Sequence, residues 1–237
     1  ALRNATENGH FKIVKFLLEN GADINARNGE VLMIASKKGY LDIVKLLLDL
    51  GALNYKNEET VLYFASSGGY YDIFQLLIKY GVNIKDSKVL NWAIENGHSN
   101  IVKLLLENGA DINNHRPIST AVLYNKYDII KLLLENGADI NAENDDALNT
   151  SARFSNCDIV KLLLENGANI HAEDDDALYT AANYGNYDVV KLLLENGANV
   201  NSKTYPSLSN AVYEGYYEIV ELLLEYGADV NTNNNEA

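Results

Sequence analysis

The sequence contains few of the residues that build extracellular, membrane-spanning or nucleic-acid-binding proteins. One cysteine among 237 residues excludes an internal disulfide. No apolar run approaches the roughly 20 residues that a membrane-spanning helix requires. The 19 basic residues are outnumbered by 33 acidic ones, which gives a net charge of −14. Such a charge disfavours binding to nucleic acid and to anionic membrane surfaces, because both need a basic protein face.

The remaining composition is that of a soluble protein with a substantial core, since 47% of the residues are hydrophobic. We predict a cytoplasmic location. The 32 asparagines are interpreted as the compositional bias of an A/T-rich genome. The sequence opens at Ala1 inside a repeating pattern, so we expect a fragment or a processed form.

Eight repeats of 28 or 30 residues run through the chain. Each ends in a block such as IVKLLLEN, whose apolar residues occupy one broad face of a helix. A glycine follows each block, and it is predicted to end the helix in a left-handed conformation. These glycines are Gly21, Gly51, Gly81, Gly109, Gly137, Gly167, Gly197 and Gly227.

A second, shorter helix precedes each of these blocks. Twelve residues before the closing glycine lies a turn residue, which is glycine in six repeats, Asn125 in the fifth and Ser155 in the sixth. Four residues before this turn, each repeat has alanine, except for Ser151. A small residue at this position allows the short helices of neighbouring repeats to pack closely.

The order of helix, turn, helix, glycine and D-I-N loop resembles the ankyrin repeat over essentially the whole chain. The resemblance is specific at E-N-G-H, at I-V-K-L-L-L-E-N-G-A and at D-I-N. The repeats are shorter than the 33 residues usual for the family, and Pro117 is the only proline at the T-P-L-H position. Short, asparagine-rich repeats of this kind are similar to those of ankyrin proteins that large DNA viruses carry in multiple copies.

The resemblance implies an all-α ankyrin-repeat solenoid, which we expect to form a single domain over residues 1–237. Its short helices and linker loops would lie on the concave side and its longer helices on the convex side. Because each repeat is shorter than the 33 residues usual for the family, we expect compact loops in place of projecting β-hairpin fingers. His10 and His98 occupy a position where ankyrin histidines usually bond the loop.

No catalytic or metal-binding pattern emerges from the sequence. The four histidines have no ligand spacing on one helix, and Cys157 has no companion thiol. Cys157 occupies a position that holds residues of several types in other repeats, so we interpret it as structural. No dinucleotide fingerprint, phosphate loop or nucleophile elbow occurs. We therefore predict neither an enzyme nor a cofactor or metal ion.

Two acidic loops are the strongest charge feature. Asp146 and Asp176 are predicted to cap the following helices. The other acids either line a solvated edge or steer a basic partner, and the spacing of a calcium loop is absent. These candidate partner-binding acids are Glu143, Asp145, Glu173, Asp174 and Asp175.

Four aromatic residues occupy the two positions before the inter-helix turn in the second half of the chain, where the first four repeats carry polar or small residues. They are Tyr124, Phe154, Tyr184 and Tyr213. The rings either form a contiguous binding patch or fold down to replace the packing of the shortened loops.

These observations favour a non-catalytic protein-interaction scaffold that binds a partner on the concave face, in the second half of the array. The partner would be a protein or peptide that carries basic residues beside an apolar anchor. The alternative is a structural spacer or assembly element that stacks end to end with further repeats, with possible end-to-end self-association. That alternative is motivated by apolar residues in the last repeat, where a polar cap is expected.

Overall fold

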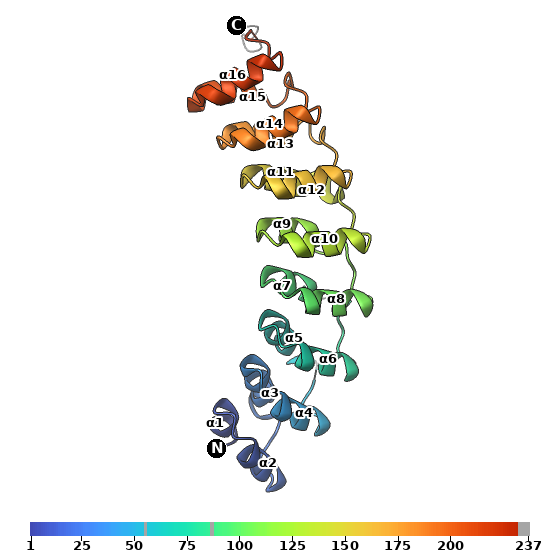
Figure 1. Ribbon diagram of the computed structural model, residues 1–237. Coiled ribbons are helices and arrows are strands. Elements are labelled where there is room, and N and C mark those ends of the chain that lie inside the picture. The colour runs from blue at the N-terminus through green and yellow to red at the C-terminus, as the bar shows by residue number, and fades with distance from the viewer. Residues whose placement is uncertain (55, 86–87, 232–237) are drawn as a thin grey trace. The chain divides into compact units, whose positions relative to one another are not determined.

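The computed structural model describes residues 1–54, 56–85 and 88–231, without the side chains of residues 143–145. Its described residues form helices, turns and loops, and none of them forms a strand. The chain divides into two compact parts, which we call the N-terminal segment (1–117) and the C-terminal segment (118–237). Within each segment, pairs of helices follow one another in regular succession (Figure 1).

Each of the eight repeats contributes one odd-numbered and one even-numbered helix. The odd-numbered helices are α1 (Leu2–Glu7), α3 (Ala26–Lys38), α5 (Glu58–Ser67), α7 (Val89–Glu95), α9 (Pro117–Leu123), α11 (Ala142–Arg153), α13 (Asp176–Asn183) and α15 (Ser207–Glu214). The even-numbered helices are α2 (Phe11–Glu19), α4 (Leu41–Asp49), α6 (Tyr71–Lys79), α8 (Ser99–Glu107), α10 (Tyr127–Glu135), α12 (Cys157–Glu165), α14 (Tyr187–Glu195) and α16 (Tyr217–Glu225).

The ends of the even-numbered helices follow from their sequences. An acidic residue such as Asp158 lies in the first turn of α12, where negative charge is favourable for the helix dipole. At the other end, the side-chain amide of Asn166 donates to the carbonyl of Leu162 at 2.8 Å. Gly167 follows with a φ of 89°, so the predicted left-handed end is confirmed. Asn20, Asn108, Asn136 and Asn196 make the same bond as Asn166.

The core lies where the odd-numbered helices pack against one another and on their even-numbered partners. The alanine position is fully buried at Ala35 and Ala181, for example, so its small side chain permits the close approach that the sequence predicts. Leucines and isoleucines of the even-numbered helices, such as Ile159 and Leu163, complete this core at 0 to 1% exposure.

In several repeats, the residue after the inter-helix turn reaches back to the preceding repeat. The Tyr70 hydroxyl donates to the carbonyl of Lys37 at 3.3 Å, and Nε2 of His98 lies 3.0 Å from the carbonyl oxygen of Ser67. In the C-terminal segment, the Asn186 side-chain amide donates to the carbonyl of Ala152 at 2.6 Å. The expected loop bond of His98 is therefore present.

Asparagines also join successive linker loops. The side-chain oxygen of Asn141 accepts the amide of Asn169, 28 residues later, at 3.0 Å. Asn201 repeats the arrangement, accepting the amide of Asp229 at 2.8 Å and donating to the carbonyl of Gly227 at 3.0 Å. The helix-ending bonds and these contacts give several of the asparagines a structural role, because asparagine supplies both a donor and an acceptor at fixed positions.

Candidate partner-binding surface

The four rings singled out in the sequence, which we call the aromatic row, all lie in the C-terminal segment, at an inter-helix turn or in the helical turn before it. Tyr124 directly follows α9, and Phe154 and Tyr184 are the C-terminal caps of α11 and α13. Tyr213 lies in the last turn of α15. Each ring therefore comes from a different, successive repeat.

All four rings are exposed to solvent. The exposed fraction is 46% for Tyr124, 53% for Phe154, 46% for Tyr184 and 85% for Tyr213. Leu123, beside Tyr124, is 53% exposed. The alternative that these rings fold down into the core is therefore wrong, since a ring that replaced lost packing would be buried.

Arg153 links two members of the aromatic row. Its guanidinium carbon lies 5.7 Å from the centre of the Phe154 ring and 5.1 Å from that of the Tyr184 ring. Both distances are in the range of a cation–π interaction. The backbone carbonyl of Arg153 also accepts a hydrogen bond from the Asn186 side chain at 3.0 Å. The two rings thus belong to one supported cluster that spans two repeats.

Two of the predicted acids serve the fold itself. One carboxylate oxygen of Asp174 accepts hydrogen bonds from the Ser202 hydroxyl and the Thr204 amide, both at 2.9 Å. Hydrogen bonds from Thr204 and Ser202 lower the pKa of Asp174. Asp174 therefore joins its own loop to the loop of the next repeat.

The prediction that Asp175 binds a partner is wrong. Its side chain is only 4% exposed, and one oxygen lies 3.0 Å from Nδ1 of His171. The same oxygen accepts the amide of Asn199 at 2.8 Å. A carboxylate that is buried and engaged in this way is not available to a partner.

The remaining acids differ in their surroundings. Glu173 is exposed, whereas the side chains of Glu143 and Asp145 lie outside the described residues. Residues 173–175 have φ values between 49° and 62°, a conformation that aspartate tolerates better than most residues. The acidic loop and Tyr184 lie at opposite ends of α13, whose eight residues span about 12 Å.

The predicted helix caps Asp146 and Asp176 are wrong. Asp146 lies inside α11, and Asp176 is the first residue of α13. The residue at the cap position of α13 is Asp175, and its side chain makes no capping hydrogen bond. Asp176 instead accepts a hydrogen bond from the side-chain amide of Asn149, and burial together with the charge of Glu173 raises its pKa.

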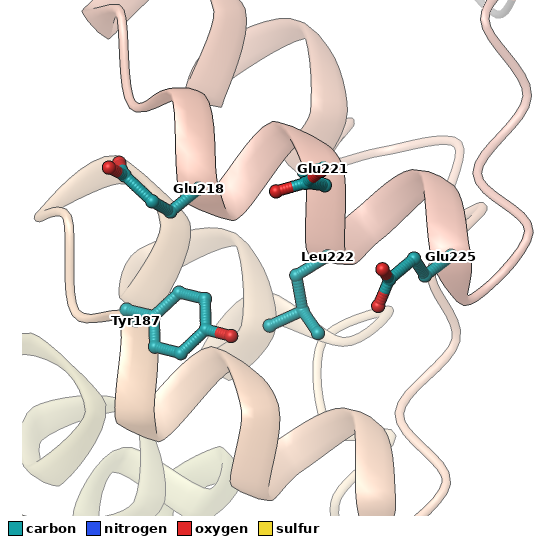
Figure 2. A pocket seen from close by; sticks show the side chains of 5 residues that line it. All are labelled: Tyr187, Glu218, Glu221, Leu222 and Glu225. Atoms are coloured by element: carbon teal, nitrogen blue, oxygen red, sulfur yellow. The ribbon is translucent and has the colours of Figure 1, made fainter.

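A pocket of about 260 Å³ lies between α14 and α16. Figure 2 shows the Tyr187 ring facing Leu222, with three carboxylates spread along α16. They belong to Glu218, Glu221 and Glu225. This pocket was not predicted from the sequence, although Glu221 lies at a position where most repeats have lysine.

Cys157 has the properties of a structural thiol. Burial raises its pKa, and the nearby carboxylates of Asp188 and Asp158 raise it further. A nucleophilic cysteine needs the opposite shift. Among the described residues, no group of three histidine, cysteine or acidic side chains is arranged to hold a metal ion.

Comparison with known proteins decides the family. A family model described as ankyrin repeats (3 copies) matches residues 32–116, 90–174 and 148–234, and a second, described as ankyrin repeats (many copies), matches residues 2–48. The chain belongs to the ankyrin-repeat family. This ankyrin-repeat chain is also similar to the crystal structure of the human ASB11 ankyrin repeat domain, with 26% identity and a TM-score of 0.73. The match covers 84% of this chain and 98% of that one.

The predicted all-α ankyrin-repeat solenoid is thus confirmed. No curated protein matches this ankyrin-repeat chain significantly. Ankyrin repeats are in general protein-interaction scaffolds and typically not catalytic. In the described part of the chain, every helix is too short or too polar to cross a membrane.

Proposed function

We propose that this chain is a non-catalytic scaffold that binds a partner protein or peptide through the aromatic row. The observation that carries the proposal is the exposure of four rings, between 46% and 85%, on successive repeats of one segment. Exposed aromatic residues gathered in one region mark interaction sites, and aromatic residues and arginine are enriched among the residues that dominate binding energy.

The N-terminal segment supports this assignment by contrast. At the same positions it carries Glu7 and Asn8, Lys37 and Lys38, Ser67 and Gly68, and Glu95 and Asn96. These side chains are charged, polar or small, and none offers a large apolar surface. The partner would therefore bind the short helices and turns of the second half of the array, on the predicted concave side.

The electrostatic part of the proposal uses those predicted acids that are exposed. Asp175 is buried, and one oxygen of Asp174 is engaged in the fold. Glu173 and Asp174 are both exposed, so these two described acids remain to attract a basic residue of the partner. Rings would supply most of the affinity, and acids would mainly raise the association rate.

The setting we propose is cytoplasmic, or the host-cell cytoplasm if the protein is viral. This proposal rests on the single, unpaired cysteine and on the asparagine-rich short repeats of the sequence.

The proposal can be tested by affinity capture followed by quantitative mass spectrometry. The double variant Phe154→Ala/Tyr184→Ala should lose a stoichiometric partner that the wild type captures, with a loss of about 2 kcal/mol or more if the rings dominate binding. The matched control is Tyr127→Ala/Tyr187→Ala, which removes rings of similar exposure from α10 and α14.

Unchanged capture by the first variant, with an unchanged circular dichroism spectrum, would place the site elsewhere. Capture of no stoichiometric partner by the wild type would favour the alternative of a structural spacer.

A further inference from the structure

A second group of aromatic rings lies in the N-terminal segment, at a different position of the repeat from the aromatic row. Tyr63 and Phe64 come from α5, and Trp92 comes from α7. The centre of the Tyr63 ring lies 5.4 Å from that of Phe64 and 5.1 Å from that of Trp92. At these distances the rings are in contact. We call Tyr63, Phe64 and Trp92 the ring cluster.

The geometry of α5 keeps the ring cluster at the surface. The core side of this helix is formed by Leu62 and Ala65, which are 1% and 0% exposed. Tyr63 and Phe64 lie between these two residues in sequence and therefore on other faces of the helix. Tyr63 is 44% exposed, and Phe64 and Trp92 are half-buried. The rings thus contact one another and still leave part of each ring open to solvent.

The position of Phe64 in the repeat is apolar in three of the eight repeats, and these three follow one another. Ile34 of α3 and Trp92 of α7 occupy it on either side, and the three helices lie side by side (Figure 1). The C-terminal segment has threonine or asparagine there, at Thr120, Thr150, Thr180 and Asn210. Because the repeat also forms with threonine, the fold does not require the large apolar side chains. Exposed apolar groups gathered in one region mark interaction sites.

Two lysines border the ring cluster. Lys37 and Lys38 lie in the last turn of α3, and both are exposed. Nζ of Lys37 lies 5.4 Å from the centre of the Phe64 ring, within the range of a cation–π interaction. Neither lysine forms an ion pair with an acidic side chain in the described part of the chain. The two lysines are therefore a local basic site in a chain whose net charge is −14.

The charge changes sign along the three helices. Glu95, in the last turn of α7, occupies the repeat position of Lys37, and the repeat between them has the uncharged Ser67 there. A carboxylate of a bound chain is thus attracted to the α3 end of this surface and repelled from the α7 end. This difference favours one direction for the bound chain.

We propose that the ring cluster, Lys37 and Lys38 form a second partner-binding surface, which binds an acidic, extended segment of another protein. A carboxylate of the segment pairs with the lysines, and an apolar side chain covers the ring cluster. The two sites are about one helix diameter apart, roughly 10 Å, which an extended chain spans in about three residues. This surface goes beyond the proposed function, because it uses no residue of the aromatic row and binds a partner of opposite charge.

Selection of short random peptides displayed on phage, against the immobilised 237-residue chain, tests the proposal without a known partner. The enriched peptides should share an aspartate or glutamate about three residues from an aromatic or large aliphatic residue. Enrichment of peptides that lack this pattern, or of none, would overturn the proposal.

The affinity of one enriched peptide, measured by fluorescence polarisation, tests the ring cluster. Phe64→Thr/Trp92→Thr introduces the residue that three C-terminal repeats carry at this position, so the circular dichroism spectrum should not change. Peptide binding should weaken about thirtyfold or more, because aromatic residues dominate such interfaces. Unchanged affinity would overturn the proposal. Phe154→Ala/Tyr184→Ala is the control, whose unchanged affinity separates this surface from the aromatic row. Tyr63→Ser is a second variant if the first loses helicity.

Charge exchange tests the two lysines. Lys37→Glu/Lys38→Asn introduces the residues that the fourth repeat carries as Glu95 and Asn96. It should weaken binding of the peptide by about threefold to tenfold at low salt and reduce the salt dependence. The same peptide with its acid replaced by lysine should prefer this variant over the wild type. Equal affinity of both peptides for both proteins would overturn the acidic assignment.

Sedimentation velocity of the chain without peptide tests a different occupant of the surface. The wild type should show no self-association that depends on Lys37 and Lys38. A dimer that dissociates in Lys37→Glu/Lys38→Asn would show that acidic residues of a second copy occupy the surface, and it would overturn binding of another protein there.

Discussion

At the scale of single residues, left-handed backbone conformations mark the ends of the helices. The turn positions occupied by Asn125 and Ser155, where other repeats have glycine, adopt φ values of 53° and 57°. Asparagine tolerates this conformation because its short polar side chain can bond locally, whereas serine suits it less well. The alignment of repeats predicted these turns correctly, because the position of a residue within the repeat determines its backbone conformation more strongly than its identity does.

Gly167 allows a direct test of this conformational requirement. Its φ is 89°, and a Cβ atom added there would meet no heavy atom within 4 Å. Gly167→Ala should therefore destabilise the protein through backbone strain alone, by about 1 kcal/mol. Gly167→Asn should cost less, because asparagine enters the left-handed region more readily. Thermal unfolding checks both values, and equal melting temperatures for all three proteins would contradict the strain argument.

At the scale of structural elements, helices could be predicted from the sequence far better than the contacts between loops. The apolar face of α12 is visible in Ile159, Leu162 and Leu163, because helical periodicity requires only local spacing. The bond from His98 to Ser67 depends on how two repeats stack, 31 residues apart. The burial of Asp175 also depends on contacts between loops. Its sequence neighbours indicate an exposed acidic run, although its side chain is buried.

For the candidate site, the sequence predicted the position of the aromatic row but not the support that Arg153 gives it. The exposure of Phe154 follows from its place at the end of α11, where no later part of that helix covers it. The acidic loops were predicted less well, because a run of acids does not reveal which carboxylates accept hydrogen bonds from the next loop.

The Asp174 contact should make the joint between two loops depend on pH. Its pKa is lowered in the folded protein by hydrogen bonds from Thr204 and Ser202. Its contribution to stability is therefore fully present above the unfolded pKa of about 3.9, and it is lost as the pH falls through the lower folded value. Asp174→Asn should melt below the wild type at neutral pH, and the difference should shrink below about pH 4.

Melting temperatures of both proteins between neutral and acidic pH provide the measurement. Glu195→Gln removes the same charge from the exposed side of α14 and should show no comparable narrowing of the difference. If the difference in melting temperature between Asp174→Asn and the wild type persists at the lowest pH, the loss of stability comes from altered geometry and not from the lost charge.

At the scale of the whole molecule, stability comes from contacts between neighbouring repeats. A single repeat cannot bury its apolar face alone. The stability of the array is therefore the sum of the intrinsic stabilities of its repeats and of the interfaces between neighbouring repeats. Ile159 is 1% exposed between two neighbours, whereas Ile13 in the first repeat is 50% exposed. The end repeats therefore have the least support.

Hydrogen exchange should follow this gradient. At low protein concentration, amides in α2 and α16 should exchange before those in α12, because the end repeats open without disturbing the rest of the array. Mass spectrometry of proteolytic fragments after timed exchange would resolve the helices. Simultaneous exchange of all three helices would contradict independent opening of the ends and would indicate one cooperative unit.

The asparagine contacts between linker loops have a consequence for how such a chain can change through inheritance. Asn141 binds the amide 28 residues later, and Asn201 binds its equivalent at the same separation. A duplication of one complete repeat would place an equivalent backbone amide at the same distance, so a bond of this kind can form again. An insertion of a single residue between Asn201 and Asp229 would break the pair. A gene for this fold can therefore gain or lose whole repeats more easily than it can gain or lose single residues within a repeat.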